Sequence, residues 1–256
     1  MDHKHLQKLL IIFTDFFTKV QMKKLLSISF IALMLQSCST QNPNPNSNGN
    51  NTTALPSVTI CNQVWTTKNL DVSTYRNGDA IPQVTDFNQW EILTTGAWCY
   101  YNNDPALGAI YGKLYNWYAV NDPRGLAPTG WHVPSNSEWN RLVRCIDPSA
   151  DTSWGLDGTQ SQIAGGSMKE QGTNHWVYTN EGATNSSGFT ALPGCLRSAS
   201  GGFPFATPGG GGYFWSSTMA PSGGYAYYRC MFWGSANLDK HDSHINEGKS
   251  VRLVKD

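Results

Sequence analysis

The sequence has few charged residues and no excess of either sign. Charged side chains make up 14% of the 256 residues, and 18 lysines and arginines balance 18 aspartates and glutamates. A disordered chain would be richer in charge and poorer in aromatics, a coiled coil would be rich in Ala, Glu, Lys and Leu, and a nucleic-acid-binding protein would carry a basic excess. The composition excludes these classes, and we expect no nucleic-acid partner.

No apolar run of the usual membrane-spanning length stands out either. The run from Leu25 to Leu35 has eleven residues, whereas a transmembrane helix needs about twenty. Two lysines precede this run and Cys38 follows it after a small residue, which is the layout of a bacterial lipoprotein signal, although Gln36 fits the pattern imperfectly. We expect residues 1–37 to be a leader, with Met22 as the true start; an unusually long n-region is the alternative.

Cys38 is the predicted lipidation site. Several acyl chains on one cysteine anchor a protein stably where one chain would not. No aspartate follows Cys38, so the retention rule for the inner membrane does not apply. We expect a lipoprotein in the outer membrane of a Gram-negative, Bacteroidetes-like bacterium, with the membrane face left open.

The residues after Cys38 divide into a tether and a domain. Residues 38–57 carry no charge and are rich in Asn, Pro and Ser, a composition typical of a flexible segment. Residues 58–256 form the predicted single domain. All ten tryptophans and eleven tyrosines follow the leader, and residues 38–256 carry 13 basic and 16 acidic side chains, so the neutral balance of the whole chain depends on the leader.

Five cysteines remain if Cys38 is lipidated, and their pairing is open. An oxidising compartment favours disulfides, but five is an odd number and no C-x-x-C spacing selects a pair. No cysteine lies within four residues of another cysteine or of a histidine, so we do not expect zinc. The remaining cysteines are Cys61, Cys99, Cys145, Cys195 and Cys230.

Local patterns predict an α+β domain with short strands. The clearest signal is a capping box of Ser135 and Glu138, which predicts a helix beginning at Asn136. Aromatic and apolar residues at helical spacing predict another helix over 109–120. Alternation of polar and apolar residues, or short runs of residue types that favour strands, predicts strands at 58–61, 63–65, 189–194, 212–217, 226–232 and 250–254.

Distinctive short motifs occur in a fixed order over 58–256, at Asn62–Trp65, Tyr75–Asp79, Cys99–Asp104, Tyr111–Val120, Gly130–Ser135, Ser187–Phe189, Ala191–Gly194, Phe214–Thr218 and Ser250–Arg252. In this order they resemble the motifs of the Fibrobacter succinogenes major paralogous domain family. The resemblance implies a C-type-lectin-like fold, distantly similar to formylglycine-generating enzymes, with two helices, short antiparallel strands, long loops, and terminal strands side by side. It implies no established reaction.

The chain departs from this family at several cysteine positions. Members often have cysteine where this chain has Ala127 and Leu253, and usually have Gly and Ser at Cys195 and Cys230. The comparison with the family implies a replacement disulfide between Cys195 and Cys230.

The sequence does not favour an enzyme. The copper chemistry of the formylglycine-generating relatives needs two close cysteines near the chain's end, and Cys230 has no partner downstream. We expect no cofactor, and His132 is interpreted as a packed core residue. Metal ligands are considered only at Asp239, His241, Asp242 and His244, where calcium is the candidate; the favoured interpretation of this segment is a polar loop, without a metal.

Aromatic side chains are the remaining candidates for ligand contacts, because sugars pack their C–H faces on Trp and Tyr. The candidates are Trp90, Trp154, Trp176 and Trp233. We expect a lipid-anchored envelope protein whose lectin-like, non-enzymatic domain binds glycan or a protein partner, with adhesion as one role. The alternatives are a structural component of an envelope or fimbrial assembly without a small ligand and, more remotely, a degenerate oxidase.

Overall fold

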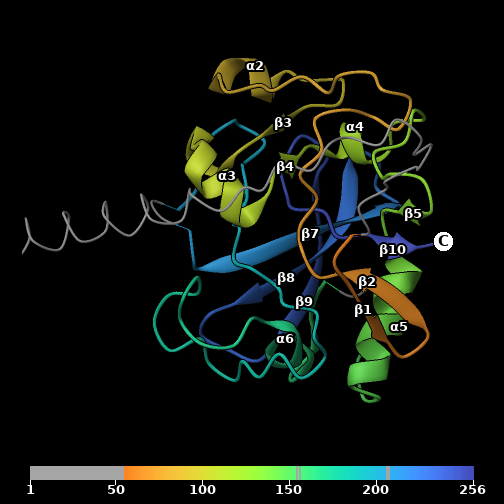
Figure 1. Ribbon diagram of the computed structural model, residues 1–256, viewed down its shortest axis with the longest axis vertical. Helices are drawn as coiled ribbons and strands as arrows, with labels where there is room; N and C mark the ends of the chain where they lie inside the picture. The colour runs from red at the N-terminus through yellow and green to blue at the C-terminus, as the bar shows by residue number, and fades with distance from the viewer. Residues whose placement is uncertain (1–54, 154, 156, 206–207) are drawn as a thin grey trace, which may run out of the picture. The chain divides into compact units, whose positions relative to one another are not determined.

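Antiparallel strand pairing organises the folded part of the chain. The computed structural model describes residues 55–153, 155, 157–205 and 208–256 (Figure 1); the predicted leader, Cys38 and most of the predicted tether lie outside this part. The helices are α2 (Phe87–Glu91), α3 (Pro105–Tyr111), α4 (Trp117–Val120), α5 (Asn136–Ile146) and α6 (Ala164–Met168), with a 3-10 helix, η1 (Tyr101–Asn103). The strands are β1 (Ser57–Ile60), β2 (Gln63–Thr66), β3 (Trp98–Cys99), β4 (Leu114–Tyr115), β5 (Trp131–His132), β6 (Gly158–Ser161), β7 (Gly211–Met219), β8 (Tyr225–Phe232), β9 (Leu238–His244) and β10 (Val254–Lys255).

Two four-stranded sheets carry most of the pairing. The sheet with the longer strands has the order β6-β9-β8-β7. The other has the order β1-β2-β10-β5, and β3 pairs with β4. All these strand pairs are antiparallel. Helix α5 contacts β7, and α6 contacts β9 (Figure 1). The predicted α+β class is therefore confirmed.

The two ends of the domain lie side by side. Val254 of β10 pairs with Trp65 of β2 on one side and with His132 of β5 on the other. The buried guanidinium of Arg252 supports this junction by donating to the carbonyls of Thr66 and Phe189 at 2.7 and 2.8 Å. Since buried charged groups need such partners, Arg252 joins the first strands to the end of the chain.

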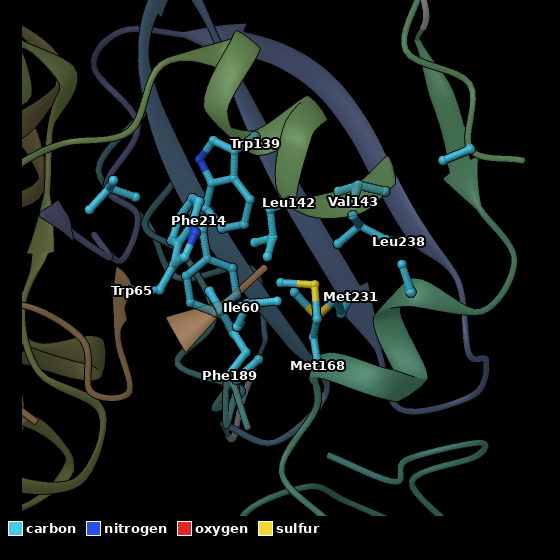
Figure 2. Packing of buried hydrophobic residues seen from close by; sticks show 14 of the residues in the cluster. Ile60, Trp65, Trp139, Leu142, Val143, Met168, Phe189, Phe214, Met231 and Leu238 are labelled. Atoms are coloured by element: carbon cyan, nitrogen blue, oxygen red, sulfur yellow. The ribbon is translucent and has the colours of Figure 1, made fainter. Parts of the chain in front are cut away.

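The capping box begins α5 as predicted. The Ser135 hydroxyl accepts from the Glu138 N–H at 3.3 Å, and the Glu138 carboxylate accepts from the Ser135 N–H at 2.8 Å. The helix then points Trp139, Leu142 and Val143 into the core (Figure 2). The Trp139 ring lies 4.8 Å from that of Trp65, centroid to centroid.

The predicted helix over 109–120 is wrong, because two short helices and a strand replace it. Helix α3 ends at Tyr111, where Gly112 has a φ of +73°, and β4 follows. A side chain on Gly112 would also lie 2.9 Å from the carbonyl oxygen of Leu70. Asn116 then caps α4 by accepting from the Ala119 N–H at 3.1 Å.

Three further expectations change in the structure. Residues 189–194 form only an isolated bridge, between Ala191 and Lys169, rather than a strand. In the predicted 250–254 strand, only Val254 belongs to a strand, β10. The supposed polar loop around Asp239 is the strand β9 instead. After Leu238, the side chains on both faces of β9 are polar. The segment therefore lacks the alternation of polar and apolar residues that predicts a strand.

Candidate functional site

The structure places two of the four candidate tryptophans in the interior. Trp90 is fully buried and donates from its indole Nε1 to the Asn246 carbonyl at 2.7 Å. Trp176 is 1% exposed and donates to the Ala191 carbonyl at 3.1 Å. Their indole nitrogens are satisfied inside the protein, so the expectation that Trp90 and Trp176 contact a ligand at the surface is wrong.

The other two tryptophans have different positions. Trp154 lies outside the described residues. Trp233 directly follows β8 and is 37% exposed, beside Tyr178, which is 73% exposed. Their ring centroids are 4.5 Å apart. Trp233 therefore remains a predicted contact residue, now with an aromatic neighbour.

Trp233 borders a surface hollow, which we call the aromatic hollow. Its volume is about 390 Å³, and its lining residues are Val177, Tyr178, Pro204, Phe205, Gly210, Phe232 and Trp233. Phe205 is also partly exposed, at 39%. Three of the exposed large hydrophobic side chains thus gather around one concave place, an arrangement that favours ligand binding over chance exposure.

A buried lysine holds the backbone beneath the aromatic hollow. The Lys169 ammonium donates to the carbonyls of Glu181, Phe232 and Ser235 at 2.8, 3.0 and 2.8 Å. The Glu181 N–H in turn donates to the Trp233 carbonyl at 2.6 Å. Burial lowers the pKa of Lys169 to about 8, against a smaller opposing effect of Glu181. Trp233 is consequently presented on backbone that is fixed at several points.

A second cluster lies on the face of β8 and β9 that carries Phe232. Cys230 is directly opposite Asp239 in the strand register, and Tyr228 is opposite His241. Because side chains alternate along a strand, Asp239 and His241 share one face of β9, whereas Asp242 and His244 share the other. The four residues considered for a metal are therefore divided into two pairs, and Cys230 joins the first pair.

The cluster is only partly exposed to solvent. Cys230 is 2% exposed, and burial together with the Asp239 carboxylate raises the pKa of its thiol to about 12. The Asp239 Oδ1 atom is buried without a hydrogen-bond partner. The Nδ1 of His241 lies 2.5 Å from the Asp157 Oδ1, at the more open side.

The disulfide implied by the family comparison is wrong. Cys195 and Cys230 are both free and buried, whereas Cys61 pairs with Cys145, with a Cα–Cα distance of 6.6 Å. Cys195 forms a backbone β-bridge with Gly212 along one edge of β7. Cys230 of β8 pairs with Tyr213 along the other edge. The strand β7 therefore separates the two thiols.

His132 is not the packed core residue that the sequence predicted. Its imidazole is 38% exposed and lies between two carboxylates, 2.9 Å from Glu138 and 2.7 Å from Asp256. Burial lowers the pKa of His132, but the hydrogen bonds that its ring donates to the Asp256 and Glu138 carboxylates outweigh it and raise the pKa above its ordinary value. This arrangement links the start of α5 to the end of the chain.

Sequence reasoning missed Tyr178 and Phe205 in the aromatic hollow and Cys230 in the second cluster. An aromatic residue in a polar loop was the available signal for Tyr178, which follows Trp176 by two positions. Nothing in the linear spacing joins Cys230 to His241, because strand pairing alone makes them neighbours.

The helices and antiparallel sheets define a mixed α+β domain, and this domain carries the two side-chain clusters. A family model, the Fibrobacter succinogenes major domain, matches residues 58–255. The chain therefore belongs to this family. No curated protein and no solved structure matches the chain. Within the described residues, no helix combines the length and apolar character needed to cross a membrane.

Proposed function

We propose that this protein is a lipid-anchored component of the cell envelope whose domain binds glycans at the aromatic hollow, without catalysing a reaction. The observation that carries the proposal is the gathering of Tyr178, Phe205 and Trp233 around one hollow. Aromatic faces bind the C–H faces of sugars while their polar edges stay in contact with water.

The size of the aromatic hollow favours a small ligand over a protein surface. A volume of about 390 Å³ falls in the range of small-molecule sites, about 300 to 1,000 Å³. A stable protein partner would cover about 800 Å² of this chain. Glycan binding with a role in adhesion is therefore the version we favour over a purely structural role in an envelope or fimbrial assembly.

Two buried thiols of the domain are unsuited to nucleophilic chemistry. Burial raises the pKa of Cys99 to about 11 and also raises that of Cys195. Because the thiolate is the nucleophile, both groups are poor candidates for covalent chemistry near neutral pH.

The binding test is a glycan array with the full chain and three variants. We expect Trp233→Ala and Tyr178→Ala to weaken binding of any positive glycan by at least about 10-fold, the equivalent of one lost aromatic contact. Tyr225→Ala is the matched control, since Tyr225 is also an exposed aromatic, at 42%, but lies at the opposite end of β8.

Two results would contradict glycan binding at this place. One is a complete lack of glycan binding; the other is equal binding by the Trp233→Ala and wild-type proteins. If an envelope protein is captured instead, and Trp233→Ala abolishes that capture, the aromatic hollow is a protein-binding site.

The outer-membrane location is proposed from the signal-like segment that ends at Cys38. In a Gram-negative host we expect Cys38→Ala to move the protein from the outer-membrane fraction to the soluble fraction and to remove fatty-acid labelling. Labelling that persists in the variant would contradict the assignment of the lipid to Cys38.

A further inference from the structure

We propose that Cys230, Asp239 and His241 bind one Zn²⁺ ion. One ligand atom from each of the three residues lies within 4.8 Å of the others. Zinc bonds of about 2.0 to 2.3 Å hold ligand atoms within about 4 Å of one another. Small side-chain rotations therefore suffice to close the three groups around an ion.

One candidate donor atom is buried without a hydrogen-bond partner and a buried free thiol lies opposite it, which points to a missing ligand. The Asp239 Oδ1 atom is buried and accepts no hydrogen bond from the described residues. The Cys230 thiol, 2% exposed and free of any disulfide, is directly opposite Asp239. A buried polar atom left without a partner is costly, and a cation between these two groups would remove that cost.

The hydrogen bond made by the third ligand leaves one of its ring nitrogens for a metal. The Asp157 carboxylate accepts from Nδ1 of His241 at 2.5 Å, so the lone pair for a metal is on Nε2. Histidine ligands of zinc commonly donate their second N–H to a carboxylate in this way, which fixes the ring and strengthens the ligand. Asp157 is thus a positioning residue rather than a ligand.

The donor set favours zinc over calcium. Calcium takes six to eight oxygen ligands, whereas thiolate, imidazole and carboxylate together suit Zn²⁺. Binding would displace the Cys230 proton to solvent, because a coordinating thiol is deprotonated. His241 is 31% exposed and Asp157 77% exposed, so the ion has a path from solvent, and water can take the fourth position.

The test is metal binding to the full chain, measured with Zn²⁺ and with Co²⁺ as a spectroscopic substitute. We expect one Zn²⁺ per chain by metal analysis, a thiolate-to-cobalt charge-transfer band that saturates at one equivalent, and a higher Tm with Zn²⁺. Cys230→Ser and His241→Gln should each abolish the band. Asp157→Asn should weaken Zn²⁺ affinity by about 10-fold to 100-fold while keeping the band.

Matched controls separate the site from general metal binding. Cys195→Ser removes another buried free thiol, and His244→Gln removes a histidine from the other face of β9; both should bind as the wild type does. Because His241 is partly exposed, His241→Gln keeps the test valid even if Cys230→Ser unfolds. Absence of stoichiometric metal, or a cobalt band that survives His241→Gln, overturns the proposal.

Discussion

The two faces of the β6-β9-β8-β7 sheet differ in how they use buried side chains. One face carries Phe214, Met231 and Leu238, which pack with α5 and α6 in an apolar core (Figure 2). The opposite face carries Tyr213, Cys230, Asp239 and His241, and the candidate ligand atoms of the last three lie within 4.8 Å of one another. The first face stabilises the fold through apolar burial, whereas the second has the donor groups that ligand binding requires.

The largest effect is expected on the core face. Phe214 is fully buried against Trp139 and Phe189. We expect Phe214→Ala to lower the free energy of unfolding by about 3 to 5 kcal/mol, because it removes apolar contacts and leaves a cavity. Denaturant unfolding measures the effect.

An exposed aromatic at the aromatic hollow provides the contrast. Tyr178→Ala should change the free energy of unfolding by no more than about 0.5 kcal/mol, although it weakens ligand binding. Equal losses of stability in Phe214→Ala and Tyr178→Ala would contradict the division of roles between the two places.

An intermediate effect is expected from the lysine beneath the aromatic hollow. Lys169→Met keeps much of the side-chain volume but leaves the carbonyls of Glu181, Phe232 and Ser235 without their donor. We expect a loss of about 1 to 3 kcal/mol in the free energy of unfolding and weaker glycan binding as Trp233 loses its fixed position. Unchanged stability and binding would show that Lys169 does not support this region.

A smaller loss of stability than at Phe214 or Lys169 is expected at the cap of α5, which covers the core face. Ser135→Ala should cost about 1 kcal/mol in the free energy of unfolding near neutral pH. Burial raises the pKa of Glu138, but hydrogen bonds from the Ser135 backbone and hydroxyl outweigh it and hold the pKa below its ordinary value.

This shift gives the cap a defined dependence on pH. A lowered carboxyl pKa stabilises the folded state above the ordinary value of about 4.3, and the stabilisation is lost as the pH falls through the folded value. The difference between wild type and Ser135→Ala should therefore shrink as the pH is lowered from 7 to about 3. A difference that stays constant or grows would contradict a role for the ionised Glu138 carboxylate.

Local signals in the sequence were sufficient where only neighbouring residues decide the structure. Ser135 and Glu138 form their capping box through bonds three residues apart, so α5 could be predicted from a short pattern. The strands that became β7 and β8 were predicted from segments rich in aromatic residues. Spacing failed over 109–120, because the approach of Gly112 to Leu70 breaks the helical pattern.

The candidate sites depended on contacts that a linear pattern does not contain. Four tryptophans had polar or small neighbours in the sequence. Trp90 is nevertheless fully buried and donates to the Asn246 carbonyl, whereas Trp233 is partly exposed. Zinc was not expected from the sequence, because no cysteine lies within four residues of another cysteine or of a histidine. Cys230 and His241 are eleven positions apart and meet only because β8 pairs with β9.

The sequence by itself determined the family, the α+β class, the cap of α5 and the signal-like segment before Cys38, because each depends on residue types at short, fixed spacing. Tertiary structure alone decided which aromatics reach the surface, which cysteines pair, and which polar groups gather on the face of β8 and β9. Burial and strand register are properties of the folded chain, and they join residues that the sequence separates.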